Sequence, residues 1–583
     1  MKLHLAGESS FQAERPARAD GPADTCRLPW SGVVAWSIVF VSFLFVGVFD
    51  HDIWAPTEPA VSGAVWNMLA HGELAVPRVN EMAYLEKPPM YYWLAYLACR
   101  LGGSMSPGLI RLPAAILGLA SLALIYSAIR RRMGETPALV TLLVAATSFM
   151  FFEIFHRAST DTLAIFFCFA CFTAFSQTLS SGMSRRRILA TDLVFSLLLA
   201  ASFYSKIFFT FLIVLPPVIV TLALLKRWSR LLTVCVATFC LTILLVIPWA
   251  ISLYQLGGWD YIRLVFVDNS IGRFFSLGVP GVAGPGIFND AMVAEHGKPW
   301  LFYAEPLVVA ALPWIFLAGA GIGRVFTRRP ADEFIVFIRS GLLSIPLVLS
   351  ISAVKVFEYI IPISFFYLLA TAVFVADQFT HARQPSRWAR TLLLCNVGLF
   401  VLGLSGVPVL LAHRENDWIL ALAAVPMAVA AAISFFVLFR SRFSPPGICA
   451  SFTAIAILPV IALMVAVPVI NEVKTCRHFF AGINHLLPGR RLYTTIRNDR
   501  ELPLANYYLE SRLTTIQFSE LRSILASDPA AAVLIKSSDV ARARECISGA
   551  EFSIITTTLG KNAFAFVTRL SRRQARRDSV SAR

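Results

Sequence analysis

Long apolar runs recur along most of the chain, and they constrain its fold more than any other feature. Of the 583 residues, 57% are hydrophobic and only 15% are charged, whereas about a quarter of the residues in soluble domains are charged. A helix needs about 20 apolar residues to cross a bilayer. The sequence therefore predicts a mainly α protein, a polytopic transmembrane helical bundle of about 13 spans at residues 31–49, 109–131, 137–154, 159–178, 188–205, 207–225, 231–254, 301–322, 334–353, 356–376, 390–411, 418–439 and 448–470.

The positions of the basic residues orient these spans. Short loops between alternate pairs of spans contain clusters of Arg, for example at 130–132 and 185–187. Such loops remain in the cytoplasm. Residues 88–103 form a fourteenth apolar run, but counting this run as a span would move the basic clusters outside. We therefore expect 88–103 to lie in the membrane interface, the N-terminal tail 1–30 to be cytoplasmic, and the C-terminus to be outside.

The net charge of the chain has the same explanation. A formal charge of +16 would suit nucleic-acid binding in a soluble protein. Here the Lys and Arg residues lie mostly in the short loops between spans. The expected surroundings are therefore membrane lipids, and no nucleic-acid partner is expected.

The remaining segments define the domain organisation. Within a transmembrane domain at 31–470, residues 50–108 form a large first outer loop carrying interfacial helices. Residues 256–300 form a second outer loop, which is too long for a simple connector and is expected to be a lid or a binding loop. Strand-like and helix-like runs then alternate, which predicts a small α/β domain at 471–570 outside the cytoplasm. The last residues, 571–583, form a basic tail.

Two pairs of cysteines raise the question of disulfides and metals. Cys476 and Cys546 bracket the C-terminal domain. Outside the cytoplasm they could form a disulfide, and free thiols are the alternative. Cys168 and Cys171 have CxxC spacing, but both lie inside a predicted span without a second pair. They are expected to be packing residues.

The first outer loop concentrates acids close to the membrane surface. Asp50, Asp52, Glu58 and Glu86 lie within it, and for any single acid an ordinary solvated loop is a sufficient explanation. Glu86 differs because it begins the sequence Glu-Lys-Pro-Pro directly before the aromatic run at 88–103. The two prolines fix the depth of this acid and its neighbouring base, which favours a functional role.

Later polar residues fall on the same predicted outer face. Asp161 begins a span, where it either caps the helix or faces a cavity, as ionisable residues at membrane depth usually do. Lys206 and Lys355 lie at the ends of spans, where they either reach toward headgroups or, with Arg273, form a cationic pocket suited to a phosphate. His296 precedes Gly-Lys-Pro-Trp and could bind a divalent metal or a phosphate.

Several motifs resemble a known family. They include W-x-P-x-E-P at 54–59, Y-x-E-K-P-P-x-x-Y-W at 84–93, N-S-I-G-R-F at 269–274 and S-x-x-K-x-x-x-Y-x-x-P at 352–362. In this order they resemble the GT-C class of membrane glycosyltransferases. The most similar branch contains the lipid A aminoarabinose transferases and the protein O-mannosyltransferases.

The resemblance implies a function and a set of site residues. Members of the class move a sugar from a polyprenyl-phosphate donor to a lipid, glycan or protein acceptor, here expected at the outer face of the inner membrane. The expected catalytic set is Glu58, Glu86, Asp161 and Asp52, of which Glu86 and Asp161 match family positions. The resemblance implies a donor phosphate-binding set of Lys87, Lys206, Arg273, Lys355, Tyr84 and Tyr359, and His296 is retained as a metal candidate. No cofactor is implied beyond a divalent metal.

The chain departs from the family pattern at two positions. Relatives typically read P-D-E-x-R where this chain has Thr57 and Ala60, so the usual catalytic Asp and a usual Arg are absent. Either Glu58 or Asp52 substitutes, or the acceptor differs, or the chain is a catalytically altered binding or assembly protein. A transporter fits the span count, but transporter sites lie at mid-membrane in broken helices rather than at one face.

Overall fold

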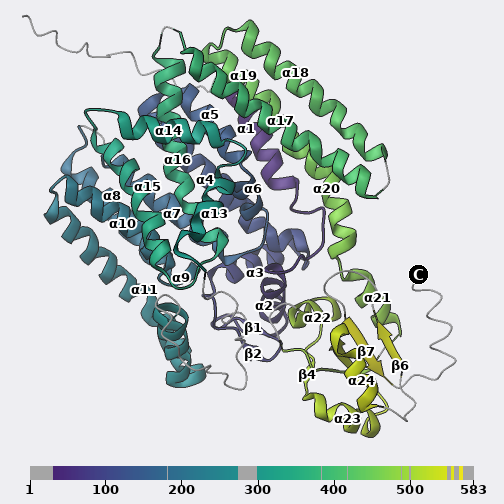
Figure 1. The fold of residues 1–583 in the computed structure, drawn as a ribbon. Coiled ribbons are helices and arrows are strands. Elements are labelled where there is room, and N and C mark those ends of the chain that lie inside the picture. The colour runs from purple at the N-terminus through teal and green to yellow at the C-terminus, as the bar shows by residue number, and fades with distance from the viewer. Residues whose placement is uncertain are drawn as a thin grey trace, which may run out of the picture.

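The protein consists of a large helical part and a smaller α/β domain at its C-terminal end (Figure 1). The computed structural model describes residues 30–179, 182–272, 298–382, 384–415, 418–486, 489–497, 501–547, 553–556 and 564–568. The first outer loop lies between the helical part and the C-terminal domain, so it contacts both (Figure 1).

Membrane-length helices dominate the described residues. Nine helices there are long and apolar enough to cross a bilayer, or eleven if each of two bent helix pairs is one span. The chain is therefore a multi-pass membrane protein. The helices of this part are α1 (Trp30–Phe45), α4 (Pro107–Met133), α5 (Glu135–Ala146), α6 (Phe149–Phe155), α7 (Thr160–Gln177), α8 (Arg185–Ala201), α9 (Phe203–Lys206), α10 (Phe209–Leu224), α11 (Trp228–Arg263), α13 (Ala304–Ala311), α14 (Ile315–Thr327), α15 (Glu333–Ile351), η3 (Phe357–Ile363), α16 (Ser364–Val375), α17 (Arg387–Glu415), α18 (Ala424–Arg440), α19 (Pro445–Ile455) and α20 (Leu458–Lys474).

Helix α16 lies at the centre of the bundle, where all of its residues are buried. Two glycines permit its neighbours to approach. A Cβ on Gly341 of α15 would lie 2.2 Å from the Phe366 ring, and one on Gly321 of α14 would lie 2.5 Å from the backbone of Ala370. The Phe366 ring also makes edge contacts with rings from α7 and α15. Close packing of this kind makes the central helices a rigid scaffold.

Two of the predicted spans are sharply bent. The 137–154 span is divided into α5 and α6 with a bend of 67°, and the 301–322 span contains a bend of 113° between α13 and α14. Pro313 lies between α13 and α14, where its ring cannot continue a helix. Both bends bring non-helical backbone to the edge of the larger of two cavities described below.

The first outer loop begins after α1 and contains two helices and a hairpin. Helix α2 (Glu58–His71) leads to strands β1 (Arg78–Val79) and β2 (Met82–Ala83), and α3 (Met90–Gly102) follows the two prolines. Helix α3 has 13 residues, which correspond to about 20 Å and are too few to cross a bilayer. It packs along α4 with Tyr91, Tyr92, Ala95 and Cys99 buried.

The C-terminal domain contains a mixed five-stranded sheet with the strand order β4-β3-β5-β7-β6. Its strands are β3 (Arg491–Thr494), β4 (Thr514–Thr515), β5 (Ala531–Lys536), β6 (Ser553–Thr556) and β7 (Phe564–Thr568), and its helices are α21 (Arg477–Leu486), α22 (Glu501–Leu509), α23 (Leu521–Ser527) and α24 (Val540–Cys546). Strands β4, β3 and β5 are parallel, whereas β7 and β6 are antiparallel. Alternate residues of β5 contribute to two different cores, of which one includes α2 of the first outer loop. Cys476 and Cys546 are both free thiols.

Candidate functional site

A cavity of about 90 Å³ brings together residues from four distant segments. Glu86, Lys87 and Pro88 line it from the first outer loop. The other walls come from the α9–α10 junction with Lys206, from Asn269, and from the α15–η3 segment with Ser352 and Tyr359. The predicted topology placed these segments on one face, and the structure places their side chains around one cavity.

Glu86 and Lys87 form the rim of this cavity. The Lys87 ammonium lies 3.1 Å from a Glu86 carboxylate oxygen, and the Tyr84 hydroxyl donates to the other oxygen of Glu86 at 3.3 Å. Both charged side chains are mostly buried but not fully enclosed. The β1–β2 hairpin holds this segment on one side and the two prolines before α3 hold it on the other. The pair is therefore pre-positioned rather than free to move into solvent.

Lys206 supplies a second positive charge at the cavity. Its ammonium forms an ion pair with Asp161 at the start of α7. The ammonium also lies 3.9 Å from the centroid of the Tyr359 ring and 4.7 Å from that of Phe209. Ser159 caps α7, so Asp161 is not needed as the cap. Asp161 lines neither of the two cavities described, and its carboxylate instead pairs with Lys206, which lines the smaller one.

Lys355 contributes differently from the prediction. Its side chain is buried, and its ammonium donates to the carbonyl oxygen of Ser352 at 2.6 Å. Its own carbonyl accepts a hydrogen bond from the Lys298 ammonium at 2.8 Å. Lys355 therefore holds the loop between α15 and η3, which shapes the cavity wall, whereas its ammonium does not line the cavity.

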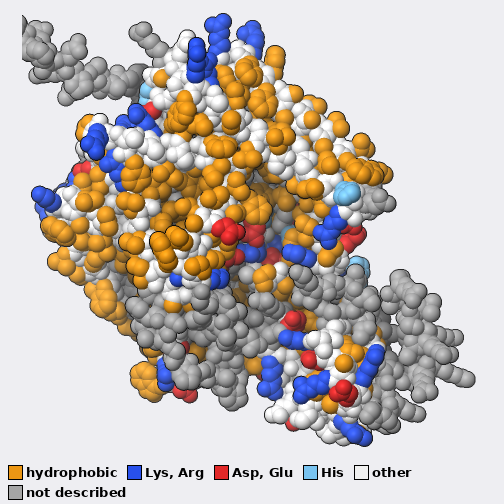
Figure 2. Space-filling view, viewed as in Figure 1, with side chains coloured by type: hydrophobic (Ala, Val, Ile, Leu, Met, Phe, Trp, Pro, Cys, Tyr) orange, Lys and Arg blue, Asp and Glu red, His pale blue; other side chains and the backbone are white. Residues whose placement is uncertain are grey.

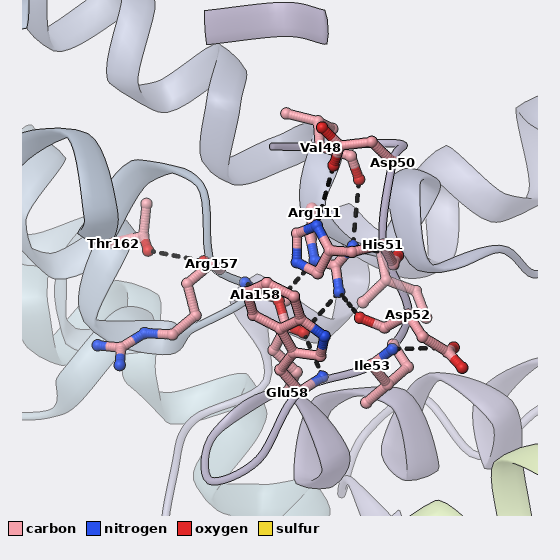
Figure 3. A network of polar contacts seen from close by, with 12 residues as sticks. Val48, Asp50, His51, Asp52, Ile53, Glu58, Arg111, Arg157, Ala158 and Thr162 are labelled. Atoms are coloured by element: carbon pink, nitrogen blue, oxygen red, sulfur yellow. Dashed lines mark hydrogen bonds and ion pairs between the residues drawn. The ribbon is translucent and has the colours of Figure 1, made fainter. Parts of the chain in front are cut away.

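Glu58 is enclosed in a buried network around Arg111 (Figure 3). Its two carboxylate oxygens accept from the Arg111 guanidinium at 2.6 and 2.7 Å, and also from the backbone N–H groups of Trp54 and Ala158. Burial opposes ionisation of Glu58, but the Arg111 guanidinium outweighs it and holds the pKa of this carboxyl below its ordinary value. Both oxygens of this carboxylate are engaged, and Glu58 lines the larger cavity described below rather than this one. A carboxylate held in this way is a poor general base.

Asp52 is also engaged away from the cavity. One carboxylate oxygen accepts from the Ile53 N–H at 2.9 Å, and the other accepts from the Thr475 hydroxyl at 2.5 Å. The geometry therefore argues against both replacements that the sequence suggested for the Asp missing at Thr57. Glu86 and Asp161 are the catalytic candidates that remain beside the cavity.

The Arg111 network was missed at the sequence level. Arg111 lies within the apolar run at 109–131 and is fully buried in α4. An ionisable residue inside a predicted span is by itself a signal of a specific partner. The signal for this network was Arg111 itself, because a buried Arg in a span needs an acidic partner, and the acids of the first outer loop precede this span in the sequence.

A second, larger cavity of about 630 Å³ lies beside the segment 51–58, from which His51 and Glu58 also line it. Apolar residues of α6, α17 and α20 form most of its walls, and Trp54, Ala55 and Pro56 close it. Arg157 lines it and is ion-paired with Glu153 at 3.1 Å and with Glu358 at 3.2 Å. Figure 2 shows a hollow in the hydrophobic face here, with charged side chains along its lower edge. A cavity that opens between lipid-facing helices suits an amphipathic ligand.

Two predicted residues, Arg273 and His296, lie outside the described residues. Within the part of the chain that the structure describes, no group of three or more His, Cys, Asp and Glu side chains could hold a metal ion.

Comparisons with known proteins agree on the class. A family model described as dolichyl-phosphate-mannose-protein mannosyltransferase matches residues 86–251. An undecaprenyl phosphate-α-4-amino-4-deoxy-L-arabinose arabinosyl transferase of Pseudomonas paraeruginosa is 28% identical over 378 residues, which are 64% of this chain and 63% of that protein. The protein of that name from Edwardsiella ictaluri is 24% identical over 57% of each chain. The chain thus matches less than two thirds of the length of these relatives.

Solved structures extend the match to the whole fold. The crystal structure of ArnT from Cupriavidus metallidurans bound to undecaprenyl phosphate superposes with a TM-score of 0.71, covering 93% of this chain and 98% of ArnT at 17% identity. Its apo structure gives a TM-score of 0.70. The resemblance to the GT-C class of membrane glycosyltransferases is therefore confirmed. The fold is similar to that of ArnT, and the similar sequences carry the name aminoarabinose transferase.

Proposed function

We propose that this chain is a glycosyltransferase that moves a sugar from a polyprenyl-phosphate donor to an acceptor at the outer face of the inner membrane. The observation that carries the proposal is the cavity at which Glu86, Lys87, Lys206 and Tyr359 meet. The names of the relatives make undecaprenyl-phosphate-linked 4-amino-4-deoxyarabinose the first donor to test.

The cavity suits the chemistry of such a donor. Transfer breaks the bond between the anomeric carbon and the donor phosphate oxygen, so negative charge grows on the departing polyprenyl phosphate. Lys87 and Lys206 supply fixed positive charge at the cavity, where stabilisation of developing charge lowers the barrier. Glu86 would accept the proton of an acceptor hydroxyl as the new bond forms. Leu212, Val348 and Leu349 in the same cavity wall provide an apolar surface for the first prenyl units.

The larger cavity is the proposed acceptor site. Its apolar walls from α6, α17 and α20 suit lipid chains, and charged side chains of both signs, among them Glu153, Arg157 and Lys474, suit a polar headgroup. This arrangement favours a lipid acceptor over a glycan or a protein. The pair Arg157–Glu358 connects the two sites, because Glu358 directly precedes Tyr359 of the donor cavity.

The proposed topology has thirteen spans, with the first outer loop and the C-terminal domain on the same side of the membrane. Counting each bent pair as one span and adding the shorter apolar helices Gly32–Phe45 and Phe209–Leu224 gives thirteen spans. The Asn80 side chain of the first outer loop donates to the Leu513 carbonyl of the C-terminal domain at 2.8 Å. These two segments must share one side of the membrane, as a thirteen-span chain with a cytoplasmic N-terminus and an outer C-terminal domain requires.

A catalytically altered binding or assembly protein is the second candidate. The observation that favours it is Thr57, whose buried hydroxyl has no hydrogen-bond partner among the described residues and cannot serve as a carboxylate base. Such a protein would bind the polyprenyl phosphate in the same cavity without turning it over.

Transfer in proteoliposomes separates these candidates. Purified protein is supplied with the undecaprenyl-phosphate-linked sugar and an outer-leaflet glycolipid, and mass spectrometry follows the sugar. The proposal expects transfer by the wild type and its loss in Glu86→Gln and Lys87→Ala, with Arg491→Ala at an exposed position of the C-terminal domain as the control. Donor binding without transfer by the wild type would favour the second candidate.

A further inference from the structure

The segment that closes the larger cavity is fastened to the end of the last membrane helix. The Asn471 side-chain oxygen accepts from the Asp52 N–H at 3.0 Å and from the Trp54 indole N–H at 3.1 Å. The Thr475 hydroxyl donates to the Asp52 carboxylate at 2.5 Å. The Lys474 ammonium lies 4.9 Å from the centroid of the Trp54 ring. Four contacts therefore join the end of α20 to the segment 52–54.

The C-terminal domain also forms hydrogen bonds with a later part of the first outer loop. Asn80 forms paired hydrogen bonds with the backbone of Leu513 at 2.8 Å, and Asn506 donates to the Asn80 side-chain oxygen at 3.0 Å. Arg512 donates to Asn67 at 2.8 Å and to Glu73 at 2.9 Å. Asn67, Asn80 and Asn506 are fully buried. Buried amides without partners are costly, so these contacts specify the docked position of the domain.

A continuous polar path runs from this junction to the membrane domain. The carbonyl of Asp52 accepts from the Arg111 guanidinium, which binds Glu58, and Glu58 accepts from the Ala158 N–H (Figure 3). Ala158 lies three residues before Asp161, the partner of Lys206. The segment 51–58 thus lies between the C-terminal domain on one side and the start of α7 on the other.

We propose that the junction of α20 with the C-terminal domain is a positioning element for the acceptor. Asn471 and Thr475 hold Asp52 and Trp54 so that the wall formed by Trp54, Ala55 and Pro56 fits the acceptor lipid. This inference rests on the proposed function, because it assigns the larger cavity to the acceptor. Neither Asn471 nor Thr475 lines either of the two cavities described above, so both residues act through the segment that they hold.

A matched pair of substitutions at Thr475 tests the proposal. Thr475→Val removes the hydroxyl while keeping the shape, and Thr475→Ser keeps the hydroxyl. For Thr475→Val we expect the KM for the acceptor glycolipid to rise about tenfold, as expected for a lost hydrogen bond to a charged group. The KM for the donor should stay unchanged, and Thr475→Ser should behave as the wild type. A purely structural role would instead lower the thermal unfolding temperature and change both KM values together.

Further variants keep the test decisive. If Thr475→Val does not fold, Asn471→Leu replaces it, and we expect the same rise in the acceptor KM. Asn506→Leu at the domain interface should also raise the acceptor KM. Arg491→Ala, far from the interface contacts, is the control. Wild-type acceptor KM values in Thr475→Val and Asn471→Leu would overturn the inference while leaving transfer intact. Absence of transfer by the wild type would instead remove the proposed function itself.

Discussion

Lys206 is ion-paired with Asp161, a residue 45 positions earlier in the chain. The pair joins the end of α9 to the start of α7, beside the rim formed by Glu86 and Lys87. Asp161 orients the Lys206 side chain in a mostly buried position. In the proposed reaction, the donor phosphate would therefore meet a cation that is already held in position.

Removing this cation is expected to weaken transfer strongly. Lys206→Met should lower kcat/KM for the polyprenyl-phosphate donor by about 100-fold, the typical effect of removing one fixed donor from a site of developing negative charge. Lys206→Arg should retain part of the activity because it keeps the charge. Radiolabelled transfer assays in proteoliposomes measure the effect, with Arg185→Gln on an exposed helix end as the control. Equal rates for Lys206→Met and the wild type would remove Lys206 from the site.

The Arg111–Glu58 pair is expected to control stability rather than catalysis. Arg111→Met would leave the Glu58 carboxylate buried without its partner, which costs about 3–5 kcal/mol. The double substitution Arg111→Met with Glu58→Gln should recover much of the loss, because neither charge remains. Thermal unfolding in detergent, followed by tryptophan fluorescence, compares the wild type with these two variants. A double variant no more stable than Arg111→Met would show that the pair is not the cause.

Acid sensitivity should follow from the same pair. The pKa of Glu58 is lowered in the folded protein, where Arg111 outweighs the effect of burial. Its stabilising contribution is therefore fully present above the ordinary carboxyl pKa of about 4.5 and is lost as the pH falls through the lower folded value. Unfolding temperatures measured from pH 6 downward should fall less steeply below pH 4.5 in Glu58→Gln than in the wild type. Parallel curves for the two proteins would contradict this assignment.

Much of the membrane part could be predicted from hydropathy because a span is a local property of about 20 residues. The Glu86, Lys87 and Lys206 grouping was also predictable, because span parity puts their loops on one face. The partners of Glu58 and Asp52 were not, since Arg111 and Thr475 are 53 and 423 residues away and no local pattern joins them. The bend between α5 and α6 was hidden because both halves are apolar.

The departure at Thr57 is expected to affect turnover more than donor binding. Thr57 precedes the first residue of α2, and its hydroxyl makes no capping hydrogen bond. Thr57→Asp would introduce a carboxylate at a helix N-terminus, where acids are favoured, without adding a charge to the donor cavity. Donor affinity should therefore change less than threefold. A rise in kcat would show that a carboxylate at position 57 contributes to turnover and that Thr57 cannot replace it. Thr57→Asn is the control, because Asn has the shape of Asp without its charge. A large fall in donor affinity in Thr57→Asp would contradict the placement of position 57 outside the donor cavity.

Transfer by Glu86→Gln tests the central claim most directly, because it removes one charge from the cavity rim and keeps the shape. Proteoliposomes containing wild-type or Glu86→Gln protein are given the undecaprenyl-phosphate-linked sugar and acceptor glycolipid, and the rate of sugar transfer and the binding of undecaprenyl phosphate are measured together. We expect the transfer rate of the variant to fall by at least about 100-fold while undecaprenyl phosphate still binds. A wild-type transfer rate in Glu86→Gln would contradict the account of this cavity as the active site.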